Sequence, residues 1–176
     1  MLLSWRSLDS ARIHGARANR YPGGMVTTAS LLDDARRRLA GAPREGLGVL
    51  RRSRWRADRI VRAGEAWHLG VLLLTDDAVL ATGEILRAAE EVRRGYTADS
   101  ARARAERQAQ ARRGGFAEGE IVHLGWQVLD VGAVDRRAAS GPLAQIDGEP
   151  GVRWSPRGGL IPLAGYLDEK IGMLRG

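Results

Sequence analysis

One segment of this chain occurs twice, 55 positions apart, and both copies resemble the start of a β-strand. Residues 64–70 read Gly-Glu-Ala-Trp-His-Leu-Gly, and residues 119–125 read Gly-Glu-Ile-Val-His-Leu-Gly. The same offset also matches Leu74 with Leu129 and Val79 with Val134. The repeat therefore predicts two strands in equivalent settings, and it places two of the three histidines, His68 and His123, on them.

Several other segments have the composition of short strands joined by turns. Residues 43–62 look extended and irregular, and the remaining runs are rich in apolar and β-branched residues. They are 66–75 and 78–86, joined across Asp76-Asp77; 120–131, the second copy; and 143–146 and 152–154, joined across 147–151. These runs predict a mainly antiparallel sheet built of hairpins.

Two helices are expected to pack on this sheet, one near each end of the chain. For a helix over 31–40, Ser30 can cap the start with Asp33 returning the bond, and Gly41 can end it in the left-handed conformation. The closing helix begins at Pro162 and carries apolar residues at helical spacing: Leu163, Tyr166, Leu167, Ile171 and Leu174. The fold class is therefore α+β.

A third helix is expected over residues 99–113, ended by Gly114-Gly115. Its only apolar residues are alanines, so it has little to bury, and we expect it to stand largely in solvent.

Length and composition exclude several classes of protein. A chain of 176 residues suits one domain, which we place at 25–176. The absence of cysteine excludes disulfides, thiolate nucleophiles and iron–sulfur clusters. No apolar run approaches the roughly 20 residues that a membrane span needs, and no signal peptide is evident, so we expect a cytoplasmic protein.

Residues 1–24 lack a periodic apolar face and carry four arginines against one aspartate. We expect this segment to be disordered, or to be a non-native extension with Met25 as the true start. A targeting arm is the alternative.

The net charge of +7 is unevenly distributed along the chain. There are 27 arginines and a single lysine, a ratio typical of GC-rich coding sequences, so the total is weak evidence for a nucleic-acid partner. Residues 36–62, however, hold ten arginines against two acids, and we expect this stretch to face an anionic partner. Within it, Trp55 lies among six arginines, the parts of a platform for single-stranded nucleic acid. A solvated arm whose Trp55 packs down on the domain is the preferred interpretation.

The repeated Glu and His residues are the candidates for chemistry. Two imidazoles and a carboxylate can bind zinc or ferrous iron, and a histidine beside a carboxylate can act as a general base, so the candidates are His68, His123, Glu65 and Glu120. Glu and His three apart in one strand point to opposite faces, which argues against a metal site. We expect no metal and no cofactor, and we interpret both histidines as structural. Imidazoles within about 6 Å of each other at a concave surface would instead indicate a shared site.

A second candidate for ligand binding lies near the C-terminus. Arg153 and Arg157, beside Gly158-Gly159, could hold a carboxylate or a phosphate. The alternative is a turn that needs its glycines, with Trp154 buried in the core.

Residues 59–75, 112–125 and 153–166 resemble segments of short actinobacterial proteins that automated annotation labels glutaminase. The resemblance rests on Gly-Glu-Ala-Trp-His-Leu-Gly and Arg-Trp-Ser-Pro-Arg-Gly-Gly. It implies hydrolysis of the glutamine side-chain amide. The serine-type enzymes need Ser-x-x-Lys, but the only lysine is Lys170, and Leu167 stands three residues before it. No catalytic residue can therefore be carried over.

The sequence thus predicts a non-catalytic binding or interaction module with a basic N-terminal stretch. Its partner would be an anionic protein or a small carboxylate ligand, with Trp55, Arg153 and Arg157 as candidate contacts. A glutaminase-type amide hydrolase is the alternative, and no membrane partner is expected.

Overall fold

The computed structural model describes residues 26–90, 99–155 and 157–176, so the expectations for residues 1–24 lie outside the described part of the chain. The described residues form an α+β fold, as the sequence predicts. Its helices are α1 (Thr28–Leu39), α2 (Asp99–Arg113), α3 (Val131–Asp135) and α4 (Leu163–Arg175). Its strands are β1 (Glu45–Arg51), β2 (Arg59–Leu69), β3 (Leu72–Leu74), β4 (Val79–Ala81), β5 (Glu84–Arg87), β6 (Ile121–Leu124), β7 (Gln127–Val128), β8 (Leu143–Ile146), β9 (Glu149–Arg153) and β10 (Leu160–Pro162).

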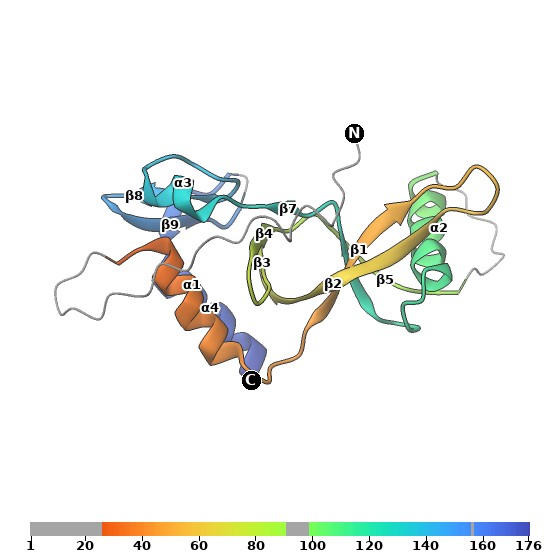
Figure 1. Cartoon of the computed structure of the whole chain (residues 1–176), viewed down its shortest axis with the longest axis horizontal. Coiled ribbons are helices and arrows are strands. Elements are labelled where there is room, and N and C mark those ends of the chain that lie inside the picture. Colours follow the sequence, from red (N-terminus) through yellow and green to blue (C-terminus); the bar gives the residue numbers. More distant parts are fainter. Residues whose placement is uncertain (1–25, 91–98, 156) are drawn as a thin grey trace.

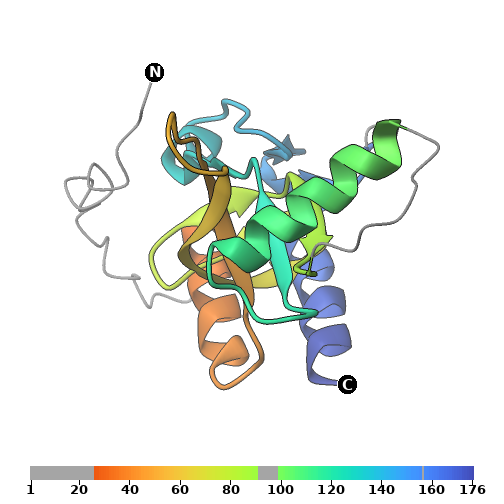
Figure 2. The ribbon, with the colours of Figure 1, turned by 90° about the vertical axis from the view of Figure 1, so that its right-hand side faces the viewer.

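The strands form a seven-stranded sheet, in the order β5-β6-β1-β2-β3-β4-β7, and a three-stranded sheet, β10-β9-β8. Helices α1 and α4 lie side by side and in contact, and α2 packs on β2 and β5 toward the opposite end of the molecule (Figures 1 and 2). Among the described helices, none has the length and apolar character needed to cross a membrane.

The two repeat copies flank one strand. All pairings in the large sheet are antiparallel except that of β1 with β6, which is parallel. Strand β1 lies between β2, which holds most of the first copy, and β6, which holds the second. The hairpin across Asp76-Asp77 was predicted, whereas the β1–β2 hairpin was not, and neither was the parallel pairing, which joins segments far apart in sequence.

The core has three parts. The largest packs α1 and α4 against β2, β3 and the small sheet, and it includes Leu32, Leu39, Leu74 and Tyr166. The second lies under α2, around Phe116 and Ile60. The third lies on β1 to β4 and consists of Leu47, Ala66, Leu73 and Leu80.

Helix α2 has the predicted bounds, but it is not merely a solvated helix. Ala109 and Ala111 are buried, and Ala111 packs in the cluster with Phe116. Alanines suffice here because the backbone comes close to the sheet: a Cβ on Gly114, just past the helix, would overlap the carbonyl oxygen of Ile60. The expectation that this helix stands largely in solvent holds for most of its residues, but its contact with the core was not predicted.

Helix α1 begins three residues earlier than predicted. Thr27 is its N-cap: the Thr27 side chain accepts a hydrogen bond from the Ser30 backbone N–H, and the Ser30 side chain accepts one from the Thr27 backbone N–H. Ser30 is therefore the third helical residue and not the cap. Asp33 instead pairs with Arg36 at 2.7 Å. Gly41 follows the helix in the left-handed conformation, as predicted.

Several predicted strand bounds were wrong for one physical reason, the position of turns. Residues 43–62 are not irregular, because 45–51 and 59–62 form the β1–β2 hairpin. The runs 66–75 and 120–131 are each broken by a glycine at positive φ, Gly70 and Gly125. The chain turns back after Gly70, whereas after Gly125 it bends and continues to β7, which pairs with β4. The second run then ends in the short helix α3, which was not predicted.

At the C-terminal end, β8 and β9 form the predicted hairpin with a tighter turn at Asp147-Gly148, both at positive φ. Helix α4 follows Pro162 as predicted, and it buries Leu163, Tyr166, Leu167 and Ile171.

Tyr166 of α4 fixes the turn after the first repeat copy. Its hydroxyl donates a hydrogen bond to the Leu69 carbonyl at 2.7 Å and accepts one from the Val71 N–H at 2.9 Å. Gly70 lies between these two groups at φ +66, where a Cβ would overlap the Tyr166 hydroxyl. The end of β2 is therefore held by a helical residue 97 positions further along the chain.

Candidate functional site

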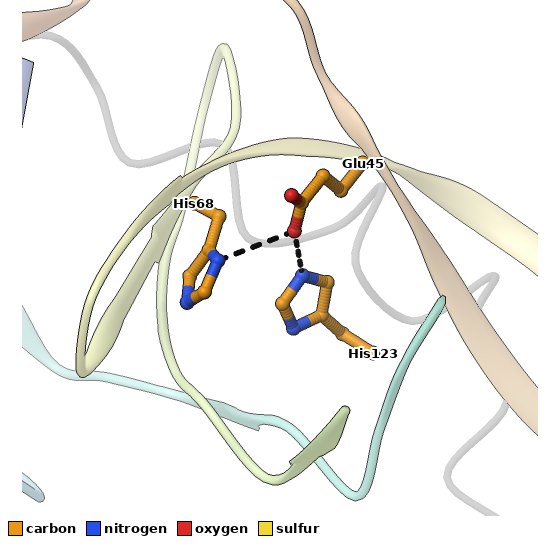
Figure 3. Close-up of side chains that lie close together, drawn as sticks. All are labelled: Glu45, His68 and His123. Carbon is orange, nitrogen blue, oxygen red and sulfur yellow. Dashed lines mark hydrogen bonds and ion pairs between the residues drawn. The ribbon is translucent and has the colours of Figure 1, made fainter. Parts of the chain in front are cut away.

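The two repeated histidines meet at a glutamate that the sequence did not single out. Glu45 Oε2 lies 2.5 Å from His123 Nε2 and 3.2 Å from His68 Nδ1 (Figure 3). The imidazole centroids are 4.7 Å apart, with the rings inclined at 66°. This separation meets the criterion of about 6 Å for a shared site, but neither histidine lines a described hollow.

Strand register explains why these three side chains converge. Glu45 pairs with Ala66 on β2, two residues before His68. On the other side of β1, Leu47, two residues after Glu45, pairs with His123 of β6. Because residues two apart in a strand share a face, all three side chains lie on one face of the sheet. The two histidines therefore stand on either side of Glu45, one on each neighbouring strand.

His68 is oriented by the turn that follows it. Its Nε2 lies 3.0 Å from the Gly70 carbonyl oxygen, which can only accept a hydrogen bond, so Nε2 carries a proton. In a neutral ring, Nδ1 then presents its lone pair to Glu45. The side chain is 25% exposed, and that of Glu45 is 24% exposed.

His123 is fully buried. Its Nε2 faces Glu45, while its Nδ1 has no hydrogen-bond partner among the described residues. Burial lowers the pKa of His123 below its ordinary value, and the nearby His68 lowers it further, whereas the bond to Glu45 opposes both. A neutral His123 that donates from Nε2 to the Glu45 carboxylate satisfies these contacts.

The two repeated glutamates take no part in this site. Glu65 and Glu120 both bind Arg62, Glu65 at 3.1 Å. The Arg62 guanidinium also lies over the Phe116 ring, 4.6 Å from its centroid. The prediction that Glu and His three apart point to opposite faces holds for Glu65 and His68, and it is the reason why Glu65 was the wrong partner.

Glu45 was missed because nothing in its local sequence marks it. Its role depends on the pairing of β1 with both repeat copies, and the pairing with β6 brings together residues 78 positions apart. No local sequence signal could have found it, because only the order of strands in the sheet places β1 between the two copies.

A described hollow lies away from these three residues. It measures about 600 Å³, is open to solvent and is lined by Glu65 and Trp67, on the opposite face of β2 from His68, together with Arg36, Ala40, Gly41, Ala42, Arg44 and Asp76. Arg44 binds Asp76 at 2.5 Å and covers the Trp67 ring. The cations of this hollow are therefore already paired.

The tip of the β1–β2 hairpin is the second candidate site. Trp55 is 93% exposed, which contradicts the interpretation that it packs down on the domain. The loop is ordered by its own bonds: Ser53 Oγ accepts from the Trp55 and Arg56 backbone N–H groups, and Asp58 accepts from the Ser53 N–H. The hairpin reaches away from α1 and α4, beside α2 (Figure 1).

The C-terminal candidates are less concentrated. Arg153 donates to the Gly158 carbonyl at 3.2 Å and so closes its own loop. Trp154 is 55% exposed, so the expectation that it belongs to the core was wrong. Arg157 is exposed, and no described residue forms an ion pair with it.

Comparison with known proteins found no matching protein family, no significant match among curated proteins and none among solved structures.

Proposed function

We propose that this chain is a binding module that contacts a polyanion through the tip of the β1–β2 hairpin, and that the polyanion is a single-stranded nucleic acid. We call this surface the hairpin tip. It consists of Trp55 and five arginines: Arg51, Arg52, Arg54, Arg56 and Arg59.

The proposal rests on which arginines of residues 36–62 are paired with acidic residues. Half of them are neutralised by described acids: Arg36, Arg37, Arg38, Arg44 and Arg62. The five at the hairpin tip form no ion pair with any residue that the structure describes, and all five are exposed. The basic character inferred from sequence is thus concentrated on one projecting loop. A cluster of unpaired cations attracts an anionic partner and repels a basic one.

The exposed indole distinguishes between anionic partners. An acidic protein surface would pair with the arginines, but it would also need an apolar pocket to bury the indole. A single strand of nucleic acid uses both, because its phosphates pair with arginine and its bases stack on aromatic rings, at about 1–3 kcal/mol per base. The ordered loop holds Trp55 outward before binding, which reduces the entropy lost on contact.

The test is a titration of fluorescently labelled single-stranded RNA and DNA with the whole protein at two salt concentrations. If all five arginines contact phosphates, the logarithm of the affinity should fall with the logarithm of salt concentration with a slope of about −3.5. Trp55→Ala should weaken binding about 5- to 150-fold. Arg54→Ala should weaken it and reduce the slope by about 0.7.

Two variants serve as matched controls. Trp154→Ala removes another exposed indole, and Arg37→Ala removes an exposed arginine of α1, away from the hairpin (Figure 1). Neither should change the affinity by more than about twofold if the hairpin tip is the contact. Absent binding, binding independent of salt, or equal losses in Trp55→Ala and Trp154→Ala would refute the proposal.

An amide hydrolase is the second candidate, favoured by one contact. A histidine beside a carboxylate is the arrangement of a base and the group that orients it, and of the two histidines at Glu45, His68 is the one that is partly exposed and within reach of a substrate. Incubation of the pure protein with glutamine should then release ammonia, and His68→Ala and His123→Ala should abolish the release. Glutamine that remains intact at high protein concentration excludes this activity.

A further inference from the structure

We infer that Glu45, His68 and His123 form a binding site for one divalent transition-metal ion, with Zn²⁺ as the ion to test. We call it the Glu–His–His site. It is independent of the proposed nucleic-acid contact, because Glu45 begins β1, whereas the hairpin tip starts where β1 ends.

Two hydrogen-bond acceptors face each other when His68 is neutral. The proton on His68 Nε2 is directed to the Gly70 carbonyl, so a neutral His68 points the lone pair of Nδ1 at Glu45 Oε2, 3.2 Å away. Two electron-rich atoms at this distance need a cation between them, either a proton or a metal ion. A metal-binding histidine commonly donates its other N–H to a backbone carbonyl, which is the contact that His68 makes with Gly70.

The donor atoms of the three residues lie close enough to reach one ion. One donor atom from each residue can be chosen so that all three lie within 4.8 Å of one another. In tetrahedral zinc sites with bonds of about 2.0–2.1 Å, ligand atoms are about 3.3 Å apart. The Glu45–His68 pair already fits at 3.2 Å, and the Glu45–His123 pair would have to open from 2.5 Å by less than about 1 Å. Glu45 and His68 can make this shift because both side chains are partly exposed.

Buried apolar side chains lie next to the three residues on the sheet. Apolar side chains pair in register with all three residues: Ala66 with Glu45, Leu73 with His68 and Leu47 with His123. These buried side chains flank the three residues on their own face of the sheet, and the partial exposure of Glu45 and His68 lets water reach a fourth coordination position. Two imidazoles and one carboxylate are a ligand set that suits zinc or ferrous iron.

Metal coordination would leave one polar atom of the site, His123 Nδ1, without a hydrogen-bond partner. If His123 binds the ion through Nε2, its proton moves to Nδ1, which has no described partner in either state. The gain must therefore come from the metal bonds and from the relief of the contact between His68 and Glu45. The ion would also tie together three strands, β2, β1 and β6, one of which is joined by the parallel pairing.

The experiment is calorimetric titration of the whole chain, freed of metal by chelation, with Zn²⁺. We expect one ion per chain. Glu45→Gln and His68→Gln should each weaken binding at least tenfold, since even partners outside the coordination sphere cost about 10- to 100-fold. Both side chains are partly exposed, so these variants should fold, and circular dichroism checks that they do.

Two control variants locate the ion. Glu65→Gln removes a carboxylate from the other face of β2, and His14→Gln removes the remaining histidine of the chain. Both should bind Zn²⁺ as tightly as the unchanged protein. No measurable binding, or equal binding by Glu45→Gln and Glu65→Gln, would overturn the inference. A loss of binding in His14→Gln alone would also overturn it.

Discussion

The hydroxyl of Tyr166 supports the site from a distance, and its removal gives a prediction of known size. In Tyr166→Phe, the Leu69 carbonyl and the Val71 N–H both lose their bonds to the hydroxyl. A buried group left without a partner costs about 1–3 kcal/mol. Leu69 is buried and Val71 is partly exposed, so we expect a loss of about 2–4 kcal/mol in the free energy of unfolding. Urea unfolding followed by circular dichroism measures it.

A double-mutant cycle with Gly70→Ala makes the prediction more specific. The added Cβ has two costs: the left-handed backbone, about 1–2 kcal/mol, and overlap with the Tyr166 hydroxyl. Gly125→Ala is the matched control, since its φ is nearly the same, +65 against +66, and nothing described lies within 4 Å of the new Cβ. Gly70→Ala should therefore cost more than Gly125→Ala.

In the Tyr166→Phe background the overlap with the hydroxyl is gone, and the nearest remaining atom is the flexible Lys170 Cε at 3.3 Å, so Gly70→Ala should cost about as much as Gly125→Ala does. Strict additivity of the two changes would refute this account of the turn. So would a loss below about 0.5 kcal/mol in Tyr166→Phe, because that is the size expected of a surface change.

Two further predictions concern stability. Burial lowers the pKa of His123 in the folded state, so the unfolded chain binds a proton on this imidazole more readily than the folded protein does. The resulting contribution to stability is complete above about pH 6.5. Below that pH it declines as the pH falls, by at most about 1.4 kcal/mol per pH unit. Urea midpoints across this range should fall more steeply for the metal-free protein than for His123→Gln, and equal slopes would contradict the burial. Gly114→Ala should fail to fold or lose the packing of α2 on the sheet, because its Cβ would overlap the backbone of Ile60. Gly115→Ala should fold, with only the cost of its positive φ. A Gly114→Ala protein of normal stability on thermal unfolding would refute this contact.

The sequence predicted what depends on local pattern. Helix periodicity placed the apolar face of α4, and acidic residues between apolar runs located the β3–β4 turn. The glycines that break both repeat copies were visible, but their positive φ was not, since the same residues could have continued a strand. Bounds of the strands were therefore too long.

What the sequence could not give depends on pairing between distant segments. The histidines were singled out correctly, yet the carboxylate between them belongs to a strand that was expected to be irregular. The exposure of Trp55 was missed for a related reason. An indole among arginines can pack or project, and the choice was made by a hairpin whose turn is fixed by Ser53 and Asp58.

The convergence of His68 and His123 on Glu45 is the claim on which the account of the repeat and the metal inference both rest. Long-range ¹H–¹⁵N NMR of the imidazoles, recorded on the metal-free protein and on Glu45→Gln, tests it most directly. We expect both histidines to change their ¹⁵N shifts in the variant, with His123 protonated at Nε2 in the unchanged protein. If the ¹⁵N shifts of either imidazole are unchanged in Glu45→Gln, the convergence of the two histidines on Glu45 is contradicted.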